Sequence, residues 1–270
     1  MGIPPAHWPQ RQPVVDEPGP AEAGADAKKK SLTAIEQSEP RIQALRRRFI
    51  ELAKSLDPRQ LVFIDEAASH IAMTREYARA PRGERAHGAV PRNTGTVTTM
   101  IGALDMNGVR AMMTIEGATD AEVFETFLER VLLRKLKPGD IVVLDNVGAH
   151  KSADVRRLIR AAGACVLYPP PYSPDLNPIE LAWSKLKALL REFGARTRDA
   201  LDDAIHRAMD LIDAADAAAW FTHCGYSGQS PGASRPADLR TVSESAEPSL
   251  RGSAALRAAS RRPLSWASHK

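Results

Sequence analysis

Cysteine is scarce in this chain of 270 residues, which contains only Cys165 and Cys224. Two cysteines cannot form a disulfide framework, and their separation does not match the paired spacing of a zinc-binding motif. Long hydrophobic runs are missing as well. No stretch of about 18 apolar residues exists, which excludes a membrane-spanning helix, and residues 1–10 lack the basic start and apolar stretch of a secretory signal. We therefore expect a cytoplasmic protein with no membrane partner.

A strong excess of either charge is also absent. Lys and Arg number 37 and Asp and Glu number 33, so the net charge is +4, which only weakly indicates an anionic partner. Residues 1–27 carry −3, residues 28–225 carry +3 and residues 226–270 carry +4. The first 20 residues hold six prolines and the last 45 hold ten serines. These compositions predict a disordered acidic, Pro-rich head over 1–27 and a disordered Ser/Arg-rich tail over 227–270, around a folded domain over 28–226.

Strand and helix patterns alternate within that domain. Two short, fully apolar runs, 61–64 and 141–144, predict buried strands, and Asn107–Gly108 between two β-rich segments predicts a hairpin. Helical spacing of apolar residues predicts helices over 38–54, 120–135, 152–162, 179–191 and 197–211, the last of the chain, and a further strand covers 165–168. This order favours an α/β fold, a mixed sheet flanked by helices on both faces.

Three acidic residues stand at informative places in this pattern. Asp65 follows the first apolar strand, Asp145 follows the second, and Glu180 lies in the first turn of a helix. Carboxylates at the ends of neighbouring central strands meet at one edge of a sheet, where ligand sites of α/β folds collect. Three hard oxygen ligands suit Mg²⁺ or Mn²⁺. A pair of such ions promotes in-line displacement at phosphorus.

Each acid also has a purely structural interpretation. An Asp after a strand is commonly a turn residue. Asn177, Pro178 and Glu180 have the spacing of a capping box, with Asn177 as the N-cap and Glu180 at the third helical position. A Glu that closes such a box is not fully available to a metal ion, so the two interpretations compete.

Three segments together form a more specific pattern, namely Phe63–Glu66, Leu144–Lys151 and Pro170–Glu180. They resemble the catalytic domain of mariner-type superfamily transposases, in the bacterial insertion-sequence branch. Members of that family carry an Asp, Asp, Glu triad with 34 residues between the last two acids, and 34 residues separate Asp145 from Glu180 here. The resemblance covers residues 28–226, about three quarters of the chain.

This resemblance implies a ribonuclease-H-like fold and a metal-dependent endonuclease and strand transferase. Asp65, Asp145 and Glu180 would hold two Mg²⁺ or Mn²⁺ ions. The implied partners are double-stranded DNA, at element ends and at a TA-type target, and a second copy in a homodimer, with no small-molecule substrate. The implied setting is the bacterial cytoplasm, at the nucleoid. Three further residues would support the metal ligands or position the DNA, namely Asn146, His150 and Asn177.

Basic residues offer contacts for DNA phosphates, since duplex DNA carries one negative charge per roughly 1.7 Å of its axis. Arginines crowd the stretch after the first strand, and we expect these to contact DNA: Arg75, Arg79, Arg82, Arg85 and Arg92. The lysines of the Glu180 helix, Lys185 and Lys187, are interpreted as a solvated face. Trp183 is interpreted as core packing.

The chain departs from the family pattern at several places. Family members carry a helix-turn-helix region before the catalytic domain, whereas only 64 residues precede Asp65 here. Ala67 stands where the family often has Thr, and residues 227–270 resemble nothing in the family. One hypothesis is a truncated or frame-shifted copy with an intact catalytic core. Two other functions stay open: a non-cutting remnant that binds DNA or regulates a full-length transposase, and a stand-alone nuclease with Glu66 or Asp175 as a fourth acid.

Overall fold

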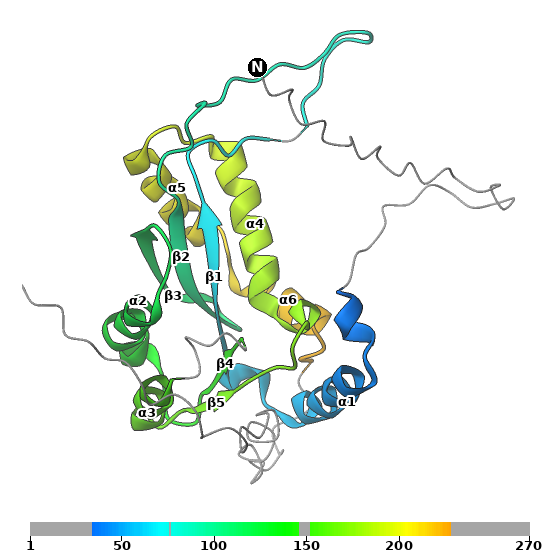
Figure 1. Cartoon of the computed structure of the whole chain (residues 1–270), viewed down its shortest axis with the longest axis vertical. Helices are drawn as coiled ribbons and strands as arrows, with labels where there is room; N and C mark the ends of the chain where they lie inside the picture. Colours follow the sequence, from blue (N-terminus) through cyan, green and yellow to red (C-terminus); the bar gives the residue numbers. More distant parts are fainter. Residues whose placement is uncertain (1–33, 76, 146–151, 228–270) are drawn as a thin grey trace, which may run out of the picture. The chain divides into compact units, whose positions relative to one another are not determined.

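A five-stranded mixed sheet forms the centre of the protein, in the order β3-β2-β1-β4-β5 (Figure 1). The computed structural model describes residues 34–75, 77–145 and 152–227. Strand β1 (Leu61–Ser69) pairs antiparallel with β2 (Thr98–Asp105) and parallel with β4 (Ile141–Leu144). Strand β3 (Gly108–Glu116) completes the hairpin with β2, and β5 (Cys165–Leu167) pairs parallel with β4. The long β1 therefore joins the antiparallel half of the sheet to the parallel half.

The apolar strands supply side chains to both faces of this sheet. Leu61 and Phe63 of β1 belong to one hydrophobic core, and Val62 and Ile64 belong to the other. Strand β4 divides in the same way, with Ile141 and Val143 on the first side. Successive side chains of a strand point to opposite faces, so a strand buried on both sides must be apolar throughout. That is why neither run shows alternation in the sequence.

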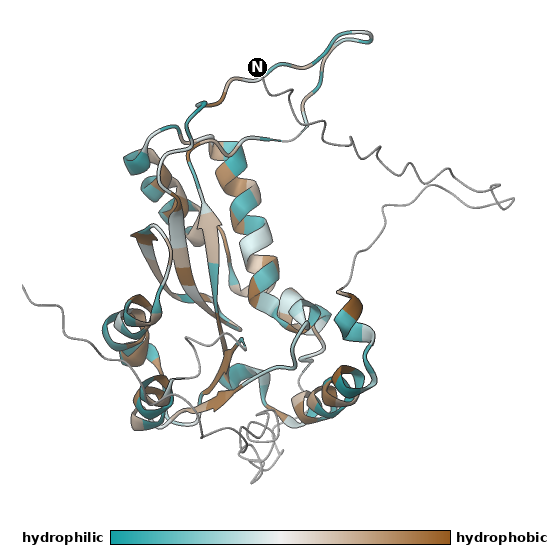
Figure 2. Cartoon of the chain, viewed as in Figure 1, coloured by the Kyte–Doolittle hydropathy of each residue, from teal (hydrophilic) through white to brown (hydrophobic). Residues whose placement is uncertain are grey.

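Helices cover each face. The first core is closed by α1 (Pro40–Ser55), α4 (Pro178–Phe193), α5 (Arg198–Asp210) and α6 (Ala214–His223). The second core is closed by α2 (Ala121–Phe127), the π-helical turn η3 (Leu128–Leu132) and α3 (Ala153–Ala161). Hydrophilic and hydrophobic residues alternate along α4 (Figure 2), as expected for a helix with one side on the core. Short 3₁₀ turns lie between these elements, namely η1 (Ile35–Ser38), η2 (Pro58–Gln60), η4 (Leu133–Lys135) and η6 (Pro174–Leu176).

The predicted fold class, a mixed sheet with helices on both faces, is confirmed. Four details differ. Strand β1 runs to Ser69, so Asp65 lies within the strand and not after it. The helix predicted over 120–135 is an α-helix only to Phe127 and continues as π and 3₁₀ turns. The segment 169–178, for which the sequence patterns indicate neither helix nor strand, contains the 3₁₀ turn η6. Helix α6 was not predicted, because its alanine-rich sequence has a weak apolar stripe. Its capping box of Asp213 and Asp216 was the available signal.

The predicted head over 1–27 and tail over 227–270 lie outside the described residues, apart from Ser227, and stay predictions. Within the part that the structure describes, no helix is both long enough and apolar enough to cross a bilayer.

Candidate metal centre

Two strands and one helix bring the three predicted acids to one place. Asp65 pairs with Gly102 of β2, one residue beyond the pair of Ile64 with Leu144 of β4. Asp145 directly follows Leu144. In the alternation described above, Asp65 comes two residues after Phe63 and Asp145 two residues after Val143, so both fall on the sheet face that α4 covers. Glu180 lies in the first turn of α4.

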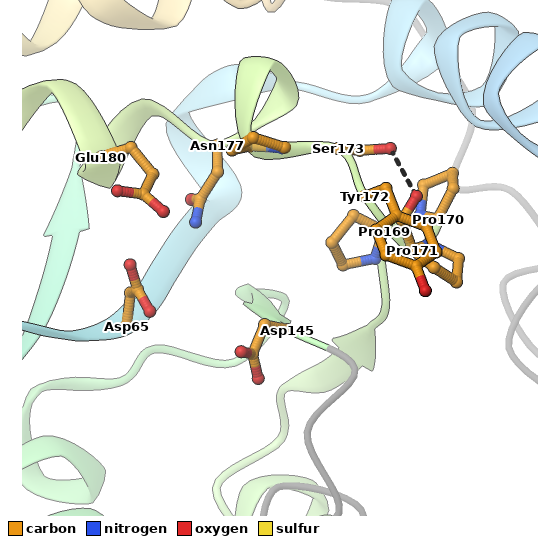
Figure 3. Close-up of a pocket in the computed structure, with 10 residues that line it drawn as sticks. Asp65, Asp145, Pro169, Pro170, Pro171, Tyr172, Ser173, Asn177 and Glu180 are labelled. Atoms are coloured by element: carbon orange, nitrogen blue, oxygen red, sulfur yellow. Dashed lines mark hydrogen bonds between the residues drawn. The ribbon is translucent and has the colours of Figure 1, made fainter. Parts of the chain in front are cut away.

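These acids line a cavity of about 310 Å³. The other lining residues are Pro169, Pro170, Pro171, Tyr172, Ser173, Pro174 and Asn177. Figure 3 shows the carboxylates of Asp65 and Glu180 pointing toward one another, with the Asn177 amide beside them and Asp145 on the same side but apart from this pair. The cavity thus has an acidic side and a side of prolines and one tyrosine.

Partial burial makes Asp65 an unusual acid. Its pKa is raised from the ordinary 3.8 to about 7, chiefly because burial disfavours the charged form. The negative charges of Glu180 and Asp145 raise it further. The backbone N–H of Glu66 and the indole N–H of Trp183 oppose the rise by hydrogen bonding to the carboxylate. A bound cation would stabilise the ionised form of Asp65, because it would offset the repulsion from the two neighbouring carboxylates.

The donor chemistry of this site fits a hard divalent cation. The donors are three carboxylates and the Asn177 amide oxygen, which are ligands that Mg²⁺ and Mn²⁺ prefer. Among the described residues, no three acidic, His or Cys side chains are gathered tightly enough to hold one ion. Like-charged carboxylates repel one another, and this repulsion opposes tight gathering when no cation lies between them. By donor type and placement, Asp65, Asp145 and Glu180 are the residues that would hold an ion.

Trp183 holds Asp65 in place, a role that the sequence did not reveal. Trp183 is buried, as predicted, and its Nε1 donates a hydrogen bond to Asp65 Oδ2 at 3.2 Å. It lies one helical turn after Glu180 on α4. The ring packs against Gly102 of β2, where an added Cβ would lie 2.6 Å from the ring. Gly102 is thus required for this close approach, and its pairing with Asp65 was invisible without the sheet register.

The capping-box interpretation of Glu180 is wrong. Helix α4 begins at Pro178 with Asn177 as the N-cap residue, but the Asn177 side chain makes no capping hydrogen bond. Asn177 and Glu180 line the cavity instead. The backbone N–H of Glu180, from which the Asn177 side chain would accept a hydrogen bond in a capping box, donates instead to the Asn177 carbonyl at 3.1 Å.

The prolines and Tyr172 are held over the cavity by the N-terminal part of the chain. Arg46 of α1 donates hydrogen bonds to Ser173 Oγ at 2.6 Å and to both carboxylate oxygens of Asp175, at 3.0 and 2.6 Å. Gln37 Nε2 donates to the carbonyl of Tyr172 at 3.0 Å. The sequence gives no sign of this role of Arg46, because its partners lie more than 120 residues away along the chain.

The remaining predicted residues have different outcomes. Asn146 and His150 lie outside the described residues. The arginines Arg75, Arg79 and Arg82 are described but do not line the cavity, and Arg75 forms an exposed ion pair with Glu192 at 2.8 Å. Strand β1 continues four residues past Asp65, so the chain is about 13 Å from Asp65 before the segment that carries these arginines begins. DNA contact by these arginines, and by Arg85 and Arg92, stays a prediction. Neither Glu66 nor Asp175 lines the cavity.

Comparison with solved structures defines the class of fold. The Mos1 transposase paired-end complex with the left transposon end matches at TM-score 0.64 and 17% identity, over 83% of this chain and 67% of that chain. The Mos1 mariner paired end complex with Mn matches at TM-score 0.58 and 20% identity, over 74% of this chain and 63% of that chain. The Mos1 catalytic domain with Raltegravir and Mn matches at TM-score 0.52 and 17% identity, over 69% of this chain and 90% of that chain. The chain thus has the ribonuclease-H-like fold of a DDE transposase catalytic domain and spans about two thirds of the two complexed Mos1 chains.

The sequence identifies the family directly. The pattern of the DDE superfamily endonucleases matches residues 60–202, more than half of the chain, and the chain belongs to that family. The matched range contains Asp65, Asp145 and Glu180. A search of curated protein sequences found no match.

Proposed function

We propose that this protein is the catalytic domain of a mariner-type transposase of the bacterial insertion-sequence branch. One observation carries the proposal: Asp65, Asp145 and Glu180, from three elements far apart in the sequence, line a single cavity of a DDE fold. The substrate is double-stranded DNA, cut at the ends of the element and joined to a TA-type target. The protein acts as a homodimer in the bacterial cytoplasm, at the nucleoid.

The chemistry is two successive displacements at phosphorus. Water attacks a phosphodiester at the element end, and the bond from phosphorus to the 3′ oxygen breaks, which leaves a 3′-hydroxyl and a 5′-phosphate. That 3′-hydroxyl then attacks a phosphodiester of the target, which forms the new strand junction and releases a target 3′-hydroxyl. No covalent bond to the protein is needed.

The chain's own residues bind and orient the reactants. Asp65, Asp145 and Glu180 would hold two Mg²⁺ or Mn²⁺ ions. Such ions activate an attacking oxygen and stabilise a leaving oxygen when bound. Trp183 fixes the Asp65 carboxylate through its indole N–H. Solved Mos1 complexes that contain transposon-end DNA, Mn or Mg support both the DNA partner and the metal.

The test is cleavage of a duplex that carries the inverted repeat bordering the gene, with and without Mg²⁺. We expect wild-type protein to nick the repeat end only with the metal. The variants Asp65→Asn, Asp145→Asn and Glu180→Gln should lose at least 100-fold in rate. Glu192→Gln, an exposed acid on the same helix as Glu180, is the matched control and should cut normally.

Two results would contradict this proposal. One is cleavage that is equal in wild-type protein and in Asp145→Asn. The other is tight binding to the repeat by well-folded wild-type protein that cuts nothing, which would support the regulatory remnant. Strand transfer into plasmids with and without TA steps tests the target separately.

A further inference from the structure

Tyr172 has a backbone conformation that L side chains rarely adopt. Its φ is +56°, and it is the one non-glycine residue with a positive φ in the ranges 34–75, 77–145 and 152–227. Such residues persist only where their surroundings hold them, and they concentrate at functional sites. The neighbouring prolines Pro171 and Pro174 restrict the same segment.

The contacts around Tyr172 hold this conformation from several sides. The Arg46 guanidinium, with only 12% of its side chain exposed, forms a two-pronged bond to Asp175 and a third bond to Ser173. Ser173 Oγ donates in turn to the carbonyl of Pro171 at 3.2 Å (Figure 3). Gln37 binds the carbonyl of Tyr172 itself. Residues on both sides of Tyr172 are therefore fixed to the N-terminal part of the domain.

The hydrogen bonds of Arg46, Ser173 and Gln37 hold an aromatic ring that is exposed to solvent. Tyr172 is 49% exposed, although it lines the same cavity as the three acids. A large aromatic side chain that is half exposed, on a backbone in a strained conformation, gains little from burial. Its position makes sense if the ring contacts something that enters the cavity.

The cavity is chemically divided. Asp65, Asp145 and Glu180 form its acidic side, while Tyr172, Pro169, Pro170 and Pro171 lie together on the other side (Figure 3). A nucleotide has a matching division, because its phosphate would bind the divalent ions that the carboxylates would hold and its flat base would lie against the ring. The volume of about 310 Å³ is at the small end of ligand sites, which suits one nucleotide better than a stretch of duplex.

We propose that Tyr172 stacks on the nucleobase next to the phosphodiester held at the acidic side. The proposal rests on the proposed function and specifies how the DNA end is held. Stacking on an aromatic ring is tolerant of sequence, because every base presents a π face. Tyr172 would therefore position the terminal nucleotide without reading its identity.

The test uses an already cut repeat-end duplex with 2-aminopurine as its terminal 3′ base, in Mg²⁺ and without target DNA, so that no further reaction occurs. We expect bound wild-type protein and Tyr172→Phe to quench the 2-aminopurine fluorescence by stacking. Tyr172→Gly should not quench, and its affinity should fall roughly 5- to 140-fold. Glycine accepts a positive φ without strain, so this variant removes the ring while it favours the native backbone. Leu211→Ala, at an apolar side chain that is 50% exposed and does not line the cavity, is the control and should behave as wild type.

A second duplex separates stacking from other roles of the ring. An abasic site at the same terminal position should abolish the affinity difference between wild type and Tyr172→Gly. Equal quenching by Tyr172→Gly and wild type overturns the proposal, and so does an affinity loss that persists on the abasic duplex. If wild-type protein cuts DNA and either result is found, only the stacking proposal fails. If wild-type protein does not cut, the proposed function fails.

Discussion

Asp65 has three properties that together set its pKa. It is partly buried, it faces two other carboxylates, and it accepts a hydrogen bond from a buried tryptophan. Burial and like charge raise its pKa to about 7, against 3.8 in the unfolded chain. The folded protein therefore binds the Asp65 proton more tightly than the unfolded chain does. The resulting cost to stability is absent below pH 3.8 and complete once the pH exceeds about 7.

The variant Asp65→Asn should consequently be inactive yet more stable. An amide keeps an acceptor for Trp183 but carries no charge, so in EDTA we expect a gain on the order of 1–3 kcal/mol in unfolding free energy at pH 8. The gain should be smaller at pH 5, where nearly all of the folded wild-type protein already has Asp65 protonated. Urea unfolding at the two pH values measures it. An equal gain at both, or a loss of stability, would contradict this account of Asp65, and Glu192→Gln serves as the exposed control.

At the scale of elements, the packing of α4 against β2 decides where Asp65 points. The Trp183 ring lies against Gly102, and its indole N–H reaches the strand next to it. The same helix places Glu180 at the cavity. Helix position and carboxylate geometry are thus linked through one glycine.

Replacement of this glycine tests that link. In Gly102→Ala the new Cβ would lie 2.6 Å from Trp183, so the ring must shift and the bond to Asp65 must weaken. We expect a stability loss of about 1–3 kcal/mol from overpacking and a fall of about 10- to 100-fold in cleavage rate or metal affinity. Gly88→Ala is the matched control, because nothing lies within 4 Å of the added Cβ. Normal metal affinity in Gly102→Ala would show that Trp183 does not position Asp65.

A second link between elements is a buried ion cluster beside the β2–β3 hairpin. Arg110 of β3 contacts Asp140, just before β4, at 2.8 Å and Asp105 at 3.6 Å. The three side chains are only 7 to 12% exposed. The cluster ties the hairpin to the start of the strand that ends in Asp145.

Removal of the arginine should strongly lower stability, because it leaves the buried carboxylates of Asp105 and Asp140 with backbone N–H donors but without their positively charged partner. We expect Arg110→Met to lower the unfolding free energy by about 3–5 kcal/mol. The exposed pair of Arg59 with Asp57 is the comparison, and Arg59→Met should cost less than about 1 kcal/mol. Denaturant unfolding measures both. Equal costs would mean that burial of the Arg110 cluster does not matter.

For the molecule as a whole, a bound divalent ion should be a source of stability. An ion that binds only the folded state adds about 2.7 kcal/mol at 100 times its dissociation constant. For a domain of this size that corresponds to a rise of about 5–11 °C in melting temperature. We expect Mg²⁺ or Mn²⁺ to produce such a rise in wild-type protein, and EDTA to reverse it.

The same melting experiment identifies the ligands without any need for activity. Glu180→Gln should lose most of the rise, and Glu192→Gln should keep it. A rise of the same size in Glu180→Gln would place the ion elsewhere.

Sequence patterns predicted the layered α/β fold because strands buried on both faces must be apolar and helices on one face must show a stripe. The hairpin followed from Asn107–Gly108, and the order of the elements was predicted correctly, apart from α6. Element bounds were less accurate. The extension of β1 beyond Asp65 depends on its pairing with β2, from Ser69 with Thr98 to Phe63 with Leu104, and such pairing has no local signal.

The sequence by itself determined the chemistry that is available: three acids at a set spacing, few cysteines and no long apolar run. Only the tertiary structure decided which groups share the site. Parallel pairing of β1 with β4 sets Asp65 beside Asp145, and α4 adds Glu180 and Trp183. A salt bridge from α1 fixes the segment that carries Tyr172. These contacts join residues up to about 130 positions apart, so they depend on strand register and helix packing, which local sequence does not encode.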